Sequence, residues 1–99
     1  MSANSEAWPA VDAVVRVVVL PKHLHARPAG QVAQLAARHH PTAVELVAGE
    51  RRANARSVLA VMGLGAVTGS QVRVEVAGPD AAAVADEVVE ILQSPEIHA

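Results

Sequence analysis

The sequence predicts an α+β fold: an open-faced β-sandwich in which three helices cover one face of a four-stranded antiparallel sheet. Two observations lead to this prediction. Four segments are rich in β-branched residues or alternate apolar and polar side chains, as strands with one buried face do. Three other segments repeat their apolar residues with the period of an α-helix. The segments follow the order β-α-β-β-α-β-α, and four half-buried strands need a layer of helices over their apolar face.

The first strand is expected over Ala13–Leu20, a run dominated by valine in which Arg16 is the one charged residue. Branched side chains fit a pleated sheet, and we expect the side chains of Val15, Val17 and Val19 to point inward. Pro21 ends this strand, and a loop over residues 22–25 follows.

The first helix is expected from about Ala26 to His39, ahead of Pro41, which prevents its continuation. Its apolar face has the spacing of an amphipathic helix. That face consists of Pro28, Val32, Leu35 and His39, flanked by Ala29, Ala33 and Ala36.

Two strands and a turn should come next, over Thr42–Val47 and Arg51–Asn54, with Val44 and Leu46 pointing inward. Residues 48–50 form the turn, and its length leaves the register of this hairpin open.

Ser57 is a suitable N-cap for a short second helix that ends near Gly63 to Gly65. The last strand, Gln71–Ala77, alternates cleanly, so its valines should point inward and its polar side chains outward. Asp80 is expected to cap a final helix over Ala81–Leu92, whose inward residues are Ala81, Val84, Ala85, Val88, Ile91 and Leu92.

Length and composition favour one domain over residues 13–93, between an N-terminal extension (1–12) and a C-terminal tail (94–99). The 99 residues are 52% hydrophobic, which suffices for a core of small branched side chains. Trp8 is the only Trp, Tyr or Phe residue in the sequence, and it either packs onto the domain or is exposed.

Several classes of protein are disfavoured. A formal charge of −2 and the lack of an aromatic stacking surface argue against nucleic-acid binding. The absence of cysteine excludes disulfides and thiolate metal sites. The apolar runs are too short for membrane insertion. We therefore expect a cytoplasmic monomer.

The start of the first helix carries the candidate chemistry. His25 should lie at its N-terminus, where the backbone N–H groups of Ala26 and Arg27 have no acceptor within the helix. Pro28 suits the first turn because its missing N–H removes no helical bond. Free N–H groups, the helix dipole and the Arg27 guanidinium together make a plausible site for a phosphoryl group.

The run Leu24–Ala29 (LHARPA) resembles the active-site signature of HPr, the family of histidine phosphocarriers of the bacterial phosphoenolpyruvate:sugar phosphotransferase system. A second run, Ala53–Gly65 (ANARSVLAVMGLG), is similar to the regulatory-serine region of that family. The two runs stand in the family's order at close to its spacing. The similarity covers Val14 to Leu92, and it implies the same open-faced fold.

The resemblance implies that His25 accepts the phosphoryl group, that Arg27 stabilises it, and that the backbone N–H of Ala26 contributes. Such a protein is a phosphoryl-transfer intermediate with no cofactor, rather than a turnover enzyme. The implied partners are enzyme I as donor and enzyme IIA domains as acceptors. A modest docking surface for them is expected at Gly30, Arg56, Val58, Leu59 and Met62, although packing in the core is the alternative for the apolar members.

Ser57 has two roles that do not exclude each other: helix capping, and phosphorylation by a serine kinase/phosphorylase as occurs in the resembling family. The sequence therefore leaves open a regulatory protein on the same fold, either in a nitrogen-related branch or as a serine-phosphorylated corepressor. Such a protein would act by binding other proteins.

His23 is the main departure, because the family usually has glycine at this position. Its side chain could alter the loop, compete for the phosphate or change the protonation of His25. A His23–His25 pair could also bind zinc, but two ligands fall short of a structural site, and we expect no metal. His39 and His40 are expected at the helix end as ordinary capping or cationic residues.

Overall fold

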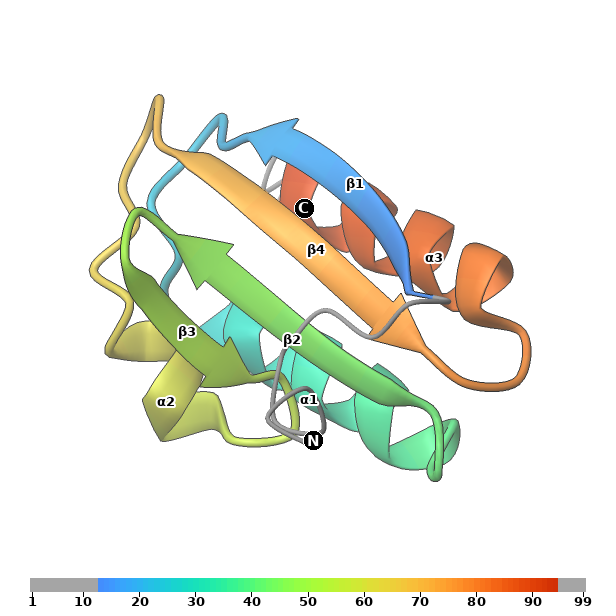
Figure 1. Cartoon of the computed structure of the whole chain (residues 1–99). Coiled ribbons are helices and arrows are strands. Elements are labelled where there is room, and N and C mark those ends of the chain that lie inside the picture. Colours follow the sequence, from blue (N-terminus) through green and yellow to red (C-terminus); the bar gives the residue numbers. More distant parts are fainter. Residues whose placement is uncertain (1–12, 95–99) are drawn as a thin grey trace.

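A computed structural model of the chain describes residues 13–94, which form one four-stranded sheet and three helices (Figure 1). The elements are β1 (Val14–Val19), α1 (Ala26–Arg38), β2 (Ala43–Ala48), β3 (Arg51–Asn54), α2 (Val58–Met62), β4 (Gln71–Ala77) and α3 (Ala81–Gln93). The predicted order of elements is confirmed. The expectations for Trp8 and for the two terminal segments concern residues outside the described part.

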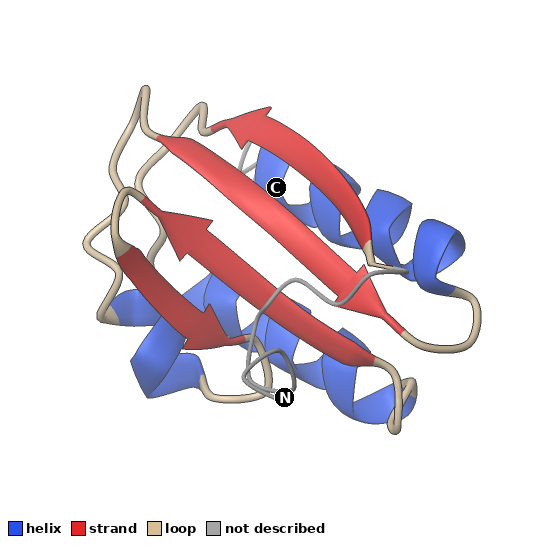
Figure 2. Cartoon of the chain, in the orientation of Figure 1, coloured by secondary structure: helices blue, strands red, loops and turns tan. Residues whose placement is uncertain are grey.

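The sheet is antiparallel throughout, with the strand order β1-β4-β2-β3. The two central strands are therefore β4 and β2, while β1 and β3 form the edges. All three helices lie on one face of the sheet and the other face carries none of the described helices (Figure 2). This is the predicted open-faced sandwich. Within residues 13–94, no helix is both long enough and apolar enough to cross a membrane.

The core lies between the inner face of the sheet and the helices, and it consists of small or branched side chains. From β2 and β4 it takes Val44, Leu46, Val72, Val74 and Val76, all pointing inward as predicted. From the helices it takes Ala29, Val32, Leu35, Ala36, Val61, Val84, Ala85, Val88 and Leu92. The helical periodicity thus identified most of the buried face of α1 and α3.

Strand β1 corrects one prediction. Its buried residue is Val18, while Val15, Val17 and Val19 are 39%, 58% and 55% exposed on the open face. The physical reason is the edge position of β1, which leaves the inner face only partly covered. Arg16 can therefore lie on the inner face, where its Nε donates to Asp86 Oδ1 of α3 at 3.0 Å.

The β2–β3 hairpin closes with a two-residue turn, because Ala48 pairs with Arg51 in the ladder. Gly49, the first turn residue, has φ +61°. Glycine at this place is typical of a type II′ turn, whose twist matches that of the flanking strands. The register that the sequence left open is thereby fixed.

Asp80 is the N-cap residue of α3, as predicted, but it does not cap the helix through its side chain. It has a left-handed φ of 58° and its side chain makes no capping hydrogen bond. The turn before α3 is held instead by Thr42, a buried residue whose Oγ1 donates to the Pro79 carbonyl at 2.7 Å. Gly78 fits here because a Cβ atom on it would lie 2.8 Å from Thr42 Cα.

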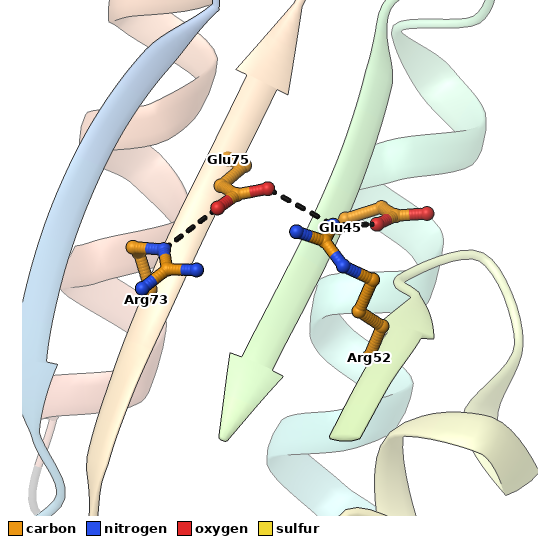
Figure 3. Close-up of polar contacts among 4 residues, drawn as sticks. All are labelled: Glu45, Arg52, Arg73 and Glu75. Carbon is orange, nitrogen blue, oxygen red and sulfur yellow. Dashed lines mark hydrogen bonds and ion pairs between the residues drawn. The ribbon is translucent and has the colours of Figure 1, made fainter. Parts of the chain in front are cut away.

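The open face of the sheet carries a charged cluster formed by Glu45, Arg52, Arg73 and Glu75 (Figure 3). The sequence predicted Glu75 to face outward, and it does, yet its side chain is fully buried. Its Oε2 accepts from Arg73 Nε at 2.7 Å and its Oε1 from Arg52 Nη1 at 3.1 Å. The same Arg52 nitrogen donates to Glu45 Oε1 at 2.6 Å.

Arg52 compensates a like-charge contact within this cluster. Glu45 and Glu75 stand directly opposite each other on β2 and β4, an arrangement that is destabilising without a cation. Desolvation opposes the charge of Arg52, but hydrogen bonds and Coulomb attraction from both glutamates outweigh it and raise the pKa of Arg52. The guanidinium therefore stays charged wherever the protein is folded.

Removing Arg52 should therefore be costly. We expect Arg52→Met to lower the free energy of unfolding by about 2–3 kcal/mol, because it leaves a buried carboxylate facing a second one. Urea unfolding at neutral pH measures this. The matched control is Arg16→Met, which breaks an exposed ion pair with Asp86 and should cost less than about 1 kcal/mol. Equal losses in the two variants would contradict a special role for the cluster.

Candidate functional site

The loop between β1 and α1 is anchored by the segment that leads into β4. Leu20 N–H donates to Ser70 O at 2.9 Å, and Gly69 N–H donates back to Leu20 O at 2.8 Å. Further along, Leu24 N–H donates to Ala66 O at 3.0 Å and the Leu24 side chain is buried. These backbone bonds fix the path of the chain up to His25.

His25 is the N-cap residue of α1, as the sequence predicted. Its backbone is extended (φ −104°, ψ −169°), its carbonyl accepts from Ala29 N–H at 3.1 Å, and its ring makes no capping bond. The ring therefore takes no part in capping the helix. The first turn contains no acidic residue, and the N–H groups of Ala26 and Arg27 have no intrahelical acceptor. The dipole of this 13-residue helix adds a partial positive charge at the same place.

A pocket of about 210 Å³ opens at this helix end. It is lined by Leu20, Lys22, His23, Leu24, His25, Arg27, Pro28, Gln31, Ile91, Leu92 and Ser94. Its lining contains two cations, two imidazoles and no carboxylate from the described residues, so it favours an anion. Arg27 is exposed and makes no ion pair within residues 13–94, which leaves its guanidinium available.

One wall of the pocket was missed by the sequence analysis. Ile91, Leu92 and Ser94 come from the C-terminal end of α3, which packs against α1. The spacing of Ile91 and Leu92 predicted a core face and nothing more, because a residue that lines a pocket and one that fills the core have the same helical period. No signal in the sequence would have placed them beside His25.

His23 lies next to His25. The two ring centroids are 4.9 Å apart and the ring planes are inclined by 55°. Within residues 13–94 no group of three or more histidine, cysteine or acidic side chains could hold a metal ion. Two imidazoles alone are too few for a structural zinc site.

Helix α2 packs beside α1 (Figure 1). Ser57 caps it as predicted, its Oγ accepting from Ala60 N–H at 3.1 Å. Leu59 is 82% exposed and Met62 40%, whereas Val58 is half-buried against the core. Arg56 is exposed next to the cap.

Gly30 lies on α1, five residues beyond His25, and it is half-exposed. An added Cβ atom would have nothing within 4 Å, so neither another backbone nor a side chain of this chain approaches it. No contact among the described residues therefore requires glycine at this position.

Comparisons with known proteins agree with this geometry. The family model described as the PTS HPr component phosphorylation site matches residues 14–94. The chain is 35% identical to the phosphocarrier protein HPr of Treponema pallidum (strain Nichols) over 71 residues, which are 72% of this chain and 80% of that protein.

Solved structures give the same result. The crystal structure of HPr from Bacillus anthracis superposes with a TM-score of 0.75 at 27% identity, over 83% of this chain and 99% of that one. The catabolite repression protein Crh of Bacillus subtilis superposes with a TM-score of 0.66 at 28% identity, over 82% of this chain and 92% of that one. Since the family model spans nearly all of the described residues and the fold is shared, this chain belongs to the HPr family of phosphotransferase-system phosphocarriers.

Proposed function

We propose that this chain carries a phosphoryl group from phospho-enzyme I to enzyme IIA domains, with His25 as the phosphorylated residue. The observation that carries this proposal is the position of the His25 ring, at the N-terminus of α1 and in a pocket whose described lining residues include no carboxylate. The family membership supplies the partner class. The protein is an intermediate in transfer rather than a turnover enzyme, and we place it in the cytoplasm as a monomer.

The transfer is a displacement at phosphorus. A neutral imidazole nitrogen of His25 attacks, an N–P bond forms, the bond from phosphorus to the donor's leaving atom breaks, and its electron pair stays with the donor. Delivery to the acceptor is the same step in reverse, with the electron pair returning to His25. The imidazole is already a nucleophile near neutral pH, so the step needs no added base.

The phosphorylated state must be stable enough to diffuse and unstable enough to give up its phosphoryl group. The N–H groups of Ala26 and Arg27, together with the Arg27 guanidinium, are placed to contact the phosphoryl oxygens. In a partly exposed pocket each such contact contributes on the order of 1 kcal/mol. That moderate stabilisation suits a carrier.

Docking is proposed for the surface formed by Gly30, Arg56, Val58, Leu59 and Met62. Leu59 and Met62 are exposed apolar side chains on α2, and Gly30 leaves room on α1. An apolar patch with a basic rim fits partners whose surface is acidic around their phosphorylation site. Because α2 packs beside α1, one partner can cover both helices while reaching His25.

A regulatory role is the second candidate. The exposed Ser57 at the α2 cap and the similarity to Crh favour it. A phosphate on Ser57 would add roughly −1.5 to −2 charges beside Arg56 and would repel an acidic partner. This role requires a kinase/phosphorylase that acts on Ser57, and a nitrogen-related set of partners is a further alternative to sugar-linked transfer.

His25→Ala should abolish phosphoryl acceptance and leave the fold intact, because the ring makes no helix-capping bond. Incubation with phosphoenolpyruvate and enzyme I, followed by intact mass, should show one acid-labile phosphate on the unmodified chain and none on the variant. His39→Ala, at the other end of α1, is the matched control and should accept phosphate normally. Undiminished acceptance by His25→Ala would make the assignment wrong.

Arg27→Ala should slow transfer about 10- to 100-fold without abolishing it, because it removes one charge-assisted hydrogen bond to the phosphoryl group. Rapid-quench measurement of phosphoryl transfer from enzyme I tests this. Arg38→Ala changes an exposed arginine at the far end of the same helix and should leave the rate unchanged. A rate for Arg27→Ala equal to that of Arg38→Ala would remove Arg27 from the proposal.

Ser57→Asp should raise the KM for enzyme I several-fold and leave the thermal midpoint unchanged, since aspartate caps a helix as well as serine does. Ser57→Ala should do the opposite, lowering stability by about 1 kcal/mol and leaving KM unaltered. The pair separates charge from capping, and raised salt should reduce the effect of Ser57→Asp. Equal KM values for the two variants would exclude electrostatic regulation at this residue.

A further inference from the structure

The neighbour of the candidate phosphoacceptor is the feature from which a further inference follows. His23 and His25 are separated by one residue of the loop, and the approach of their rings shows that both side chains leave the chain on the same side. Leu24, between them, points the opposite way into the core and is bonded to Ala66 through its N–H. The bond and the burial of Leu24 thus fix the backbone between the two histidines, and their ring centroids lie 4.9 Å apart.

The groups around His23 define its electrostatic setting. Lys22, His25 and Arg27 are the ionisable side chains that line the pocket with it, from the loop and from α1. From α3, the described lining residues are Ile91, Leu92 and Ser94, none of which is charged. Lysine and arginine keep their charge throughout the neutral range, whereas histidine alone changes charge between about pH 5 and 8.

We propose that His23 is a second binding group for the phosphoryl group on His25, its imidazolium N–H donating to a phosphoryl oxygen, so that acidification stabilises the phosphorylated carrier. The proposal rests on the proposed function, in which His25 is the residue that becomes phosphorylated. Glycine, which the resembling family usually has at this position, offers no such donor. The present chain therefore combines a fixed cation, Arg27, with one whose charge depends on pH.

The sign of the effect follows from linkage. A phosphoryl dianion on the neighbouring His25 ring favours the protonated form of the His23 imidazole. Protonation of His23 must then favour phosphorylation of His25 by the same factor. Protonated His23 stabilises the phosphorylated carrier fully at pH values below the range in which His23 titrates in the unphosphorylated protein. This stabilisation is lost as the pH rises through the range in which His23 titrates in the phosphorylated protein.

The N–P bond itself is made and broken as described above, with the electron pair returning to His25 when an acceptor attacks. His23 forms no covalent bond and gains or loses only its own proton. Compared with a chain that lacks the His23 ring, this chain should therefore favour its phosphorylated form more strongly as the pH is lowered. The chemistry of the transfer step stays the same.

An NMR titration tests the contact without any partner protein. Phosphoramidate, a small-molecule donor that phosphorylates imidazoles, is used to load the full chain, and each histidine ring is followed from about pH 5 to about pH 9. Phosphorylation of His25 should move the titration midpoint of His23 upward by about one pH unit. His39 and His40, at the other end of α1, are internal controls and should not move.

Two results of this titration would overturn the proposal. One is an unmoved midpoint of His23 while His25 is phosphorylated. The other is a phosphoryl group mapped to His23 itself, which would make His23 an acceptor rather than a donor of a hydrogen bond. Loading of His25 with a shifted His23, combined with failure of enzyme I to phosphorylate the chain, would support this inference while rejecting the proposed donor.

A competition experiment measures the consequence. Equal amounts of ¹⁵N-labelled parent chain and unlabelled variant share a limited quantity of phosphoryl groups through catalytic enzyme I, and intact mass gives the partition. In competition with His23→Ala, the ratio of phosphorylated parent to phosphorylated variant should be about 5 to 10 at about pH 6 and less than about 2 at about pH 8.5.

Two further variants make the competition specific. His23→Gln keeps an N–H donor that cannot titrate, so its partition against His23→Ala should be the same at both pH values. His39→Ala should share the phosphoryl group equally with the parent throughout. Equal partition between His23→Ala and the parent at both pH values would show that His23 does not bind the phosphoryl group.

Discussion

Packing between the inner face of the sheet and the three helices holds every other feature of this protein in position. The side chains that fill this layer are valine, leucine and alanine, and they leave little freedom in how α1 and α3 lie on the strands. Once α1 is placed, its N-terminus lies at the end of the loop that leaves β1. The helix dipole, the free N–H groups and His25 therefore meet because of the way the core is packed, and no dedicated binding loop is required.

Much of this arrangement could be predicted from the sequence, because alternation and helical period report burial directly. Strand β4 and the inner faces of β2, α1 and α3 followed from apolar spacing alone. The face of β1 did not, because valine occupies both of its faces and an edge strand leaves Arg16 room to reach Asp86. The burial of Glu75 on the open face also escaped prediction, since it depends on arginines from two different strands.

The candidate site, too, could be predicted from the sequence only in part. His25, Arg27 and Ser57 were identified from local patterns, because each lies at a helix terminus whose position a sequence reveals. The α3 wall of the pocket and the contact between the His23 and His25 rings depend on how distant elements pack and on which way a loop turns. Local patterns carry no information on either. The same packing layer brings α2 and its exposed side chains beside α1, so a partner can meet the apolar surface and the histidine at once.

The charged cluster on the open face has a consequence for how this sequence can diverge. Glu45 and Glu75 face each other and share the nitrogen of a single arginine, so the identity of each of these residues depends on the others. Loss of Arg52 is less costly where Glu75 has already become neutral or apolar, whereas loss of Arg52 first leaves the buried Glu75 carboxylate opposite Glu45 without this cation. Related sequences should therefore covary at these positions. Reconstructed ancestors should show the substitution of Glu75 before that of Arg52.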